Sequence, residues 1–596
     1  MKFKKILSTL TATVVLGSMA AMPTSAAEKS AYVDYASALQ ASLYLYDANY
    51  CGEDVGEKSG LTWRDDCHTY DKEILVDGVP TDLSGGFHDA GDHVKFGLPA
   101  AYSAFTLGLA YKQFPNSFDS TKQTAHLETI TDHFAEYFRK CIIYNEDGTV
   151  KTFVYQVGTG TPDHNYWGSP EDQPQDSGRV DAYTTNEKNI CADILGATIS
   201  ALAINYDNFG NEADLKAAQD LYAYLDTFRE VIVNDTSDDT DDLEVVSKVP
   251  EYVRWEDATN QNSPFDYISL AAATMKVADP ANTATYDSLD NPANAMGINE
   301  IYKGYYPCNW DGVHGFYNLM AGNLSAVTGN VLDNLGVGQE YTTNFHSTQK
   351  WGNARLNASL QFLGLIADKV GGGTTTYGEW ARGQMDYLFG DNPQNQAYVV
   401  GYDYNPDVKY VKYPHHRASD GGTTSPGAWN ENWYDTNADG TWTPKAGINI
   451  VQTEQKYVLI GALSGGPEDA SGLFIDSTNN YIGNEVAIDY QAGFVGALAG
   501  LFEVYQNDGT ASIVEPPSNL AEGVSNKYAL NPTPDPTPTP DPAGPDDPSV
   551  IPDTPAVTTG TSKSGAKQTG TSGPAAIIIT GLLCAGAAYA LRRKQD

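Results

Sequence analysis

The sequence predicts an all-α fold, a single helical barrel whose long loops build a cleft at one end. Apolar residues recur at helical spacing in several segments, strand signals are few and short, and no second linker or tandem repeat interrupts the folded part. Several helices are rich in Ala and apolar on more than one face, so we expect them inside the assembly. The strongest helical segments are residues 99–114, 189–206, 265–279 and 351–370.

The two ends of the chain are typical of targeting segments. Residues 1–27 combine a basic start, an apolar stretch and small residues, as secretory signal peptides do. Residues 575–591 are uncharged and precede a basic tail, and a helix needs roughly 17–25 such residues to cross a bilayer. The basic tail places that end inside the cell. We therefore expect an anchored, extracellular protein.

Composition then divides the chain into four parts. We expect a signal peptide at 1–27, a folded domain at 28–510, a Pro/Thr/Gly-rich linker at 511–573 and an apolar anchor at 574–596. A buried core helix is the alternative for the apolar run. The preceding "AKQTG" resembles a bacterial LPxTG wall-sorting motif without its Leu-Pro, so membrane retention and wall attachment both stay open.

Charge and aromatic content indicate the class of partner. The formal net charge of −40 argues against nucleic acid, whose binders carry basic patches. The 38 Tyr residues suit a surface that meets flat, hydroxyl-rich ligands, and sugars fit that description.

The cysteine pattern gives no metal motif. Of 6 cysteines, Cys584 lies in the anchor, and the others are Cys51, Cys67, Cys141, Cys191 and Cys308. Cys51 and Cys67 are close enough in sequence for a local disulfide. No CxxC spacing indicates structural zinc, and we expect most of these side chains to be small buried hydrophobes.

Two carboxylates in "GGFHDAGDHVKF" are the first catalytic candidates. The Ala-Gly pair between Asp89 and Asp92 allows a sharp turn, so both side chains can hold one water molecule. Such a pair is a general-base device. The alternative is that one Asp caps the helix beginning near Pro99 or closes an Asx turn.

A third carboxylate, Glu485, lies in "FIDSTNNYIGNEVAIDYQAG". A long apolar helix follows it, and Asn484 could cap that helix. The helix dipole would then lower the pKa of Glu485. To serve as a proton donor, Glu485 needs burial and the charges of Asp89 and Asp92 to outweigh the dipole. The alternative is an ordinary first-turn glutamate.

The segment "YPHHRASD" supplies a basic cluster. Successive residues of an extended loop face opposite ways, so we expect only one of His415 and His416 to face a cleft, with Arg417 on the side of His415. A solvated basic loop is the alternative. Ligands at metal-binding spacing are lacking around these histidines.

These three segments together resemble glycoside hydrolase family 9, the inverting cellulases, over nearly all of residues 30–507. The resemblance implies that Asp92 is the catalytic base and that Asp89 also holds the water. It further implies that Glu485 is the acid. Its remaining implications are His415 and Asp476 as active-site residues and Arg417 and Tyr490 as substrate contacts.

Weaker matches extend the resemblance to the cleft walls. "DHNYWGSPED" implies sugar contacts from His164 and Trp167, and "KWGNARLNASL" implies contacts from Trp351 and Arg355. Core packing is the alternative for each aromatic side chain. The departures from the family pattern are Phe87 and His88 for Trp-Tyr, Gln491 for Asn, and about four additional residues between Asn405 and Pro414.

The resemblance also implies an (α/α)6 barrel and an inverting mechanism. In that mechanism the acid and base carboxyls stand roughly 6.5–9.5 Å apart to admit a water molecule. No cofactor is required, but structural calcium is possible at an unknown site. The loop at 263–266 is a poor match to the expected one. "DTNADGTW" begins like a calcium loop but has Ala446 at position twelve, so we expect a turn-rich insertion.

We therefore predict a secreted, surface-anchored endo-β-1,4-glucanase acting on a β-glucan polysaccharide. Xyloglucan, mixed-linkage glucan and exo-acting release of cellobiose are alternatives within the enzymes. A non-catalytic carbohydrate-binding surface protein is the alternative from another class. Few residues separate the folded part from the proline tether, so we expect no separate carbohydrate-binding module and favour soluble or amorphous glucan.

Overall fold

The computed structural model describes the chain from Ser30 to Tyr528, with gaps. The described residues are 30, 32–177, 181–187, 189–230, 264–290, 308–310, 312–333, 335–338, 351–372, 376–422, 433–438, 442–452, 454–468, 471–506 and 523–528. The chain divides into two units, Met1–Thr533 and Pro534–Asp596, and all described residues lie in the first. The predicted signal peptide, the anchor and nearly all of the linker lie outside the described residues.

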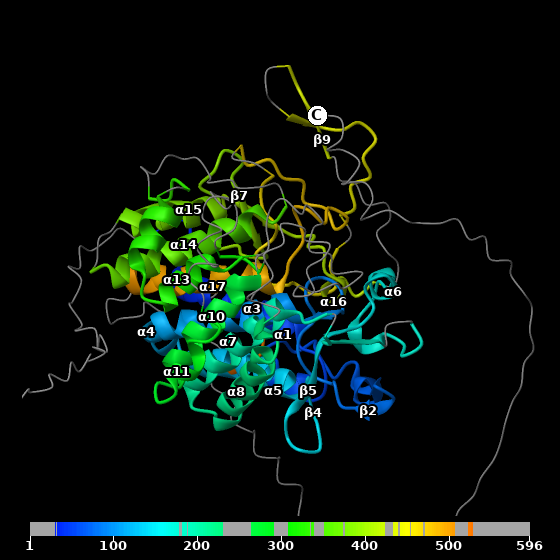
Figure 1. Cartoon of the computed structure of the whole chain (residues 1–596). Coiled ribbons are helices and arrows are strands. Elements are labelled where there is room, and N and C mark those ends of the chain that lie inside the picture. The colour runs from blue at the N-terminus through cyan, green and yellow to red at the C-terminus, as the bar shows by residue number, and fades with distance from the viewer. Residues whose placement is uncertain are drawn as a thin grey trace, which may run out of the picture. The chain divides into compact units, whose positions relative to one another are not determined.

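Long helices form a closed circuit within the first unit (Figure 1). Helix α3 packs on α7, α7 on α10, and α10 on α13; the π-helix η5 joins α13 to α14, which packs on α17, and α17 returns to α3. The circuit consists of α3 (Gly97–Gln113), α7 (Ala192–Phe209), α10 (Pro264–Ala278), α13 (His314–Met320), η5 (Ala326–Leu332), α14 (Asn353–Val370) and α17 (Ile488–Tyr505). This arrangement confirms the four predicted helical segments and the helical fold class.

Further helices pack against this circuit or connect it. Helix α1 packs on α17, α5 on α3 and α7, α8 on α7, α11 on α10, and α15 on α14. Their bounds are α1 (Tyr35–Asn49), α5 (Thr124–Lys140), α8 (Glu212–Asp226), α11 (Thr283–Tyr286) and α15 (Thr376–Leu388). The shorter helices are α2 (Val55–Lys58), η1 (Thr69–Glu73), α4 (Pro115–Ser120), α6 (Gly160–Asn165), η2 (Pro170–Asp172), α16 (Arg417–Asp420) and η7 (Asn526–Tyr528).

Small residues let the inner helices approach closely. A Cβ atom on Gly493 or Gly496 of α17 would lie 2.3 Å from Ser359 Oγ or 2.7 Å from the Phe362 ring, both on α14. Alanine-rich faces produce the same effect along α3 and α7, where most residues are buried on every side. The prediction that these helices lie inside the assembly is therefore confirmed.

The strands are short and form small sheets on the loops. β5 pairs antiparallel with β3, β4 and β6, β1 with β2, and β9 with β10, whereas β7 and β8 are parallel. Their bounds are β1 (Ile74–Val76), β2 (Val79–Thr81), β3 (Lys95–Phe96), β4 (Ile142–Tyr144), β5 (Val150–Val157), β6 (Ala182–Thr184), β7 (Gln396–Val400), β8 (Lys409–Val411), β9 (Tyr434–Thr436) and β10 (Trp442–Pro444). The predicted turn-rich insertion is thus a β-hairpin, and its residues 439–441 lie outside the described part.

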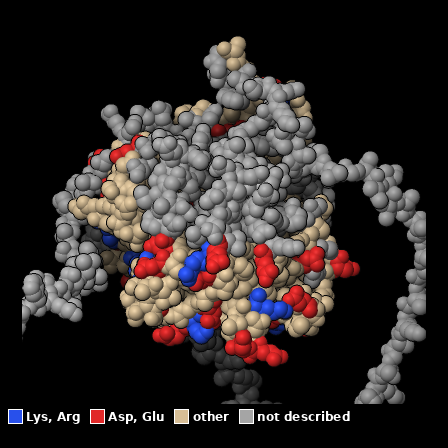
Figure 2. Space-filling model, viewed as in Figure 1, with Lys and Arg blue, Asp and Glu red and all other residues tan. Residues whose placement is uncertain are grey.

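Charged side chains of both signs lie on the described surface. On the face shown in Figure 2, acidic and basic side chains are interspersed. Several described lysine and arginine residues are paired with carboxylates, as Lys276 is with Asp287 and Asp290 at 2.7 Å each. Among the described residues, no helix is long and apolar enough to span a membrane.

Candidate active site

The segment that carries Asp89 and Asp92, residues 84–97 (the base loop), runs into β3 and α3. Asn49, at the end of α1, fixes it by donating hydrogen bonds from Nδ2 to the carbonyls of His88 and Ala90, at 3.0 and 2.9 Å. Helix α3 begins after Phe96, and no side-chain bond caps it. The alternative that one aspartate caps this helix is therefore wrong.

The base loop packs backbone to backbone against residues 412–417 (the histidine loop). The Arg417 amide donates to the Gly91 carbonyl at 3.0 Å. A Cβ atom on Gly91 would lie 2.0 Å from the His415 carbonyl oxygen, closer than real Cβ atoms come to other atoms. Gly91 is therefore needed for the approach of these two segments.

Glu485 lies on a third segment, residues 476–487 (the acid loop). This segment is bonded to the histidine loop and continues into α17, whose first residue is bonded to the base loop. The His415 amide donates to the Asn484 carbonyl at 2.8 Å, and the Ile488 amide donates to the Asp89 carbonyl at 2.9 Å. His415 and Glu485 form a parallel bridge. The three loops therefore bring all three predicted carboxylates into one region.

Glu485 does not occupy a helix N-terminus, which corrects the sequence-based expectation. Helix α17 begins at Ile488, and its N-cap residue Ala487 is extended. The side chain of Asn484 donates to Asp476 and to the Tyr413 carbonyl instead of capping the helix. Glu485 therefore lies three residues before the helix, and its pKa is set by its neighbours.

The surroundings of Glu485 favour a protonated carboxyl. One oxygen, Oε2, accepts hydrogen bonds from Trp351 Nε1 and the Tyr490 hydroxyl, both at 2.6 Å. Burial raises the pKa of Glu485, those two hydrogen bonds lower it and Asp489 raises it, with a net result above the ordinary value. Both donors are on Oε2, so Oε1 is the better placed oxygen for a transferable proton.

Asp92 has the opposite balance and stays ionised. Its Oδ2 lies 2.7 Å from His164 Nε2, and His164 Nδ1 donates to the Gly160 carbonyl at 2.7 Å, so both ring nitrogens carry protons. Burial raises the pKa of Asp92, but the charge and hydrogen bond of His164 outweigh it and leave this pKa below the ordinary value. His164 is half exposed, so this pair borders solvent.

Burial and neighbouring charges act together on Asp89. Burial raises its pKa well above the ordinary value, and the charges of Asp489, Asp92 and Glu485 raise it further. Within the part of the chain that the structure describes, the buried oxygen Oδ1 of Asp89 has no hydrogen-bond partner. A buried carboxylate oxygen of this kind suits a water molecule held there.

The adjacent histidines His415 and His416 make different contacts. His415 Nδ1 donates to the Thr478 carbonyl at 2.7 Å, and burial together with Arg417 lowers its pKa to about 3, so the ring is neutral. His416 caps α16 and donates from Nε2 to Asn49 Oδ1 at 3.0 Å. His416 thereby links the histidine loop to the residue that fixes the base loop.

Arg417 is buried, so the alternative of a solvated basic loop is wrong. Its guanidinium donates to the carbonyls of Tyr166 and His164 at 3.0 and 2.9 Å and lies over the Trp167 ring at 4.7 Å. Trp167 in turn lies 5.1 Å from the His415 ring. Arg417 therefore holds the segment that presents His164 and Trp167, both predicted as sugar contacts.

Asp476 connects two loops through both oxygens of its side chain. Its oxygens accept from the backbone amides of Lys412 and Tyr413 and from the side chain of Asn484, at 2.8, 3.1 and 2.7 Å. These bonds hold the histidine loop to the residue before Glu485. Asp476 therefore links the histidine loop to the acid loop.

The remaining predicted contacts surround Glu485. Trp351 packs edge to face on Tyr481 at 5.1 Å. Arg355 Nη1 donates to Asp489 at 2.9 Å and lies over the Tyr490 ring at 5.0 Å. Sequence reasoning missed Asp489, although a carboxylate directly before the predicted Tyr490 was a visible signal.

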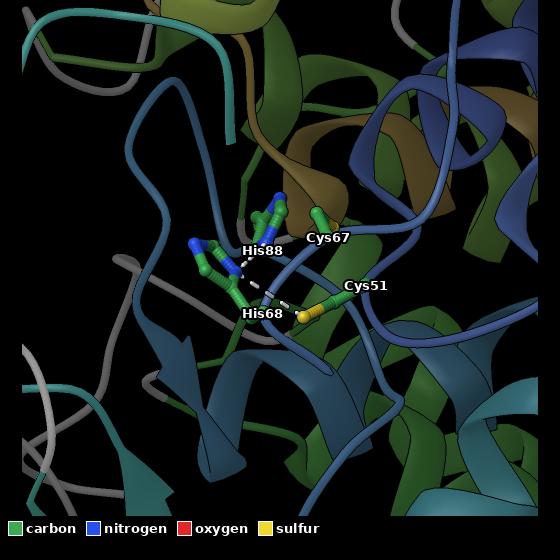
Figure 3. Close-up of side chains that lie close together, drawn as sticks. All are labelled: Cys51, Cys67, His68 and His88. Atoms are coloured by element: carbon green, nitrogen blue, oxygen red, sulfur yellow. Dashed lines mark hydrogen bonds between the residues drawn. The ribbon is translucent and has the colours of Figure 1, made fainter. Parts of the chain in front are cut away.

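Four side chains whose donor atoms could together hold a metal ion, one of them on the base loop, were not predicted as a group. The donor atoms of Cys51, Cys67, His68 and His88 all lie within 4.8 Å of one another. In Figure 3, dashed lines join His68 to Cys51 and to His88. His68 Nδ1 lies 3.5 Å from Cys51 Sγ and 3.1 Å from His88 Nε2. The adjacent residues Cys67 and His68 are the feature of the sequence that could have indicated a metal site. The other two side chains of the group, Cys51 and His88, lie on other segments of the chain.

The donor set of this cluster fits zinc. His68 Nε2 donates to Gln173 Oε1 at 2.8 Å, which leaves the lone pair of Nδ1 directed at the other donors. Two thiols and two imidazoles are a tetrahedral zinc set. The five described cysteines are buried and form no disulfide with one another, so the alternative of a Cys51–Cys67 disulfide is wrong. His88, a departure from the family pattern, directly precedes Asp89 and would tie the base loop to the metal.

Zinc removal should therefore destabilise the domain. We expect about one zinc per chain by elemental analysis, and Cys51→Ser should lose it and lower the unfolding free energy by roughly 3–5 kcal/mol. Cys141→Ser, which changes a buried cysteine outside the cluster, should retain the metal. Equal zinc content in both variants would contradict this assignment.

The two calcium candidates gain no support from geometry. Ser263 lies outside the described residues, and Asp266 is buried with its Oδ2 at 3.7 Å from His314 Nδ1. The loop beginning at Asp435 is the hairpin of β9 and β10. Structural calcium therefore stays an untested expectation.

Comparisons with known proteins identify endoglucanases as relatives of this chain. Endoglucanase B of Cellulomonas fimi is 29% identical over 84% of this chain, which spans 45% of that protein. Endoglucanase A of Bacillus pumilus is 30% identical over 79% of this chain and 67% of its own length. This chain therefore spans about half to two thirds of these curated relatives.

Solved structures share the fold. The catalytic domain of Clostridium thermocellum CelT is 32% identical, with a TM-score of 0.62 over 82% of this chain and 100% of that one. The cellulase Cel9M of C. cellulolyticum, solved with cellobiose, is 30% identical, with a TM-score of 0.63 over 79% and 99%. These neighbours have an (α/α)6 barrel, the fold that the family resemblance implies for this chain. The model of the glycosyl hydrolase family 9 matches residues 35–498, and this chain belongs to that family.

Proposed function

We propose that the protein is an endo-β-1,4-glucanase that hydrolyses cellulose-type β-glucans with inversion at the anomeric carbon. Asp92 takes a proton from the attacking water, Asp89 holds that water, and Glu485 protonates the departing glycosidic oxygen. The supporting observation is the pair of opposite pKa shifts, since burial raises the pKa of Glu485 whereas His164 lowers that of Asp92. Such a pair separates an acid from a base.

Two partly exposed side chains beside the carboxylates suit contact with a sugar. Trp351, which donates to Glu485, is partly buried, and His164 is half exposed beside Asp92. Trp167 and Tyr490 are each only 3% exposed, so these two rings pack in the interior. The C. cellulolyticum relative was solved with cellobiose, and a C. thermocellum relative with cellobiose and cellotriose. We propose that this chain takes the same class of ligand.

Release of reducing sugar from a panel of polysaccharides tests this proposal. We expect hydrolysis of soluble carboxymethylcellulose with a rapid fall in viscosity, because an endo-acting enzyme cuts within chains. If the enzyme prefers xyloglucan or mixed-linkage glucan, the proposed substrate changes and the proposed mechanism stays the same. Binding without hydrolysis of any β-glucan would favour a carbohydrate-binding protein and contradict the proposal.

The pH profile should reflect both carboxyls. Activity is lost as pH rises through the pKa of Glu485, which lies above 4.5, and as pH falls through that of Asp92, which lies below 3.8. His164→Gln removes the charge that offsets burial, so the acid limb of kcat/KM should move up by about one to two pH units. An unchanged acid limb would contradict the role of the His164–Asp92 pair.

We also propose that the enzyme is secreted and held at the bacterial cell surface by its C-terminal segment. Support comes from the signal-like residues 1–27 and the apolar run with its basic tail. A chain ending before the proline repeat should appear in the medium, whereas the full chain should stay with the cells. Equal release of both would contradict attachment through this segment.

A further inference from the structure

Asp489 lies in the first turn of α17, buried beside two other carboxylates. Its side chain is 4% exposed, and its charge raises the pKa of both Asp89 and Glu485. Burying a third carboxylate beside an acid and a water-holding aspartate is costly unless a cation offsets it. Arg355, 11% exposed, supplies that cation through a hydrogen bond of 2.9 Å to Asp489.

Arg355 lies between Asp489 and Tyr490, one of the two side chains that donate hydrogen bonds to Glu485. Its guanidinium carbon lies 5.0 Å from the centre of the Tyr490 ring, and the Tyr490 hydroxyl donates to Glu485 Oε2 at 2.6 Å. Gly352 keeps this space open, because a Cβ atom there would lie 2.8 Å from Arg355 Nε and 2.9 Å from the Tyr490 hydroxyl oxygen. The guanidinium and the phenol therefore have little room to shift.

We propose that Asp489 is a positioning residue for the acid: it holds Arg355 against Tyr490, and Tyr490 occupies Glu485 Oε2 so that Oε1 carries the proton. This inference rests on the proposed function and adds a residue to it. Asp489 touches neither the attacking water nor the scissile oxygen in this account. It acts through Arg355 and Tyr490.

The charges also determine the direction of the expected effect. Asp489 raises the pKa of Glu485, and Arg355 lowers it. Removing the Asp489 charge therefore leaves Arg355 unopposed and makes Glu485 more acidic. The other titratable or charged groups that act on Glu485, Asp489 or both are Asp89 of the base loop, Arg417 of the histidine loop, Tyr46 of α1, Tyr102 of α3 and Tyr490 of α17.

The pH dependence of kcat/KM on a soluble β-glucan tests this proposal. Asp489→Asn should move the alkaline limb down by about one pH unit. Arg355→Gln should move it up, because it removes the opposite charge, and the double variant should return it close to the wild-type position. Asp489→Glu, which keeps the charge, should restore most of the wild-type profile.

Controls separate this role from simple packing. Glu503→Gln alters another ion-paired carboxylate of α17, bonded to Lys369 at 2.7 Å, and should leave both limbs in place. An alkaline limb that stays fixed in Asp489→Asn, with only stability reduced, would overturn the proposal. If Asp489→Asn does not fold, a limb unmoved in Arg355→Gln overturns it equally. A wild-type protein without hydrolytic activity would instead overturn the proposed function.

Discussion

Glu485→Gln should lower kcat on soluble cellulose by about 10²–10⁴-fold, the contribution usual for a general acid. Glutamine keeps the size of the side chain and can still accept hydrogen bonds from Trp351 and Tyr490, which hold Oε2 at 2.6 Å. Its amide group is too weak an acid to protonate the departing oxygen. Substrate binding should persist, so the loss should fall on kcat with little change in KM.

A substrate with a good leaving group provides the diagnostic control. An aryl cellobioside whose leaving group needs no protonation should regain much of its rate in Glu485→Gln, whereas cellulose should not. Thermal melts should show a folded variant. Equal loss on both substrates would contradict the role of Glu485 as proton donor.

Gly91→Ala should disrupt the junction of the base and histidine loops. The new methyl group would lie 2.0 Å from the His415 carbonyl oxygen, and the neighbour is backbone that cannot rotate away. The loops must separate, which should break the bond from the Arg417 amide to the Gly91 carbonyl and move Asp92 relative to Glu485. We expect at least about a 100-fold loss of kcat/KM, as misplacement near 1 Å produces, and roughly 2–3 kcal/mol lower stability.

Gly329→Ala is the matched control for that change. Gly329 lies in η5, and nothing stands within 4 Å of a Cβ atom placed there. Activity and melting temperature should stay close to wild type. Near-normal activity in Gly91→Ala would show that the two loops tolerate separation and would contradict the geometry given for the base.

Much of the fold was predictable because helical periodicity is local information. The four apolar segments became α3, α7, α10 and α14, since their alanine-rich faces must be buried wherever the chain places them. The boundary of α17 was predicted less well. Asparagine is a residue type typical of a helix N-cap, but the Asn484 side chain donates a hydrogen bond to Asp476, and the helix begins only at Ile488.

The candidate site was predictable to the extent that its residues lie in compact motifs. Asp89, Asp92 and His415 each stand in such a motif, and the structure places them on bonded loops with Glu485. The Cys51 cluster was missed because its donors come from three separate segments. Asp489 was missed because its importance depends on Arg355, which precedes it by 134 positions.

Proton NMR of the first product tests the central claim of this account most directly. If Asp92 directs water to the face opposite the bond that Glu485 protonates, cleavage of a cellooligosaccharide must first give the α-anomer, which then mutarotates. Initial appearance of the β-anomer would mean retention through a covalent intermediate. That result would contradict the assignment of a water-activating base and a separate acid.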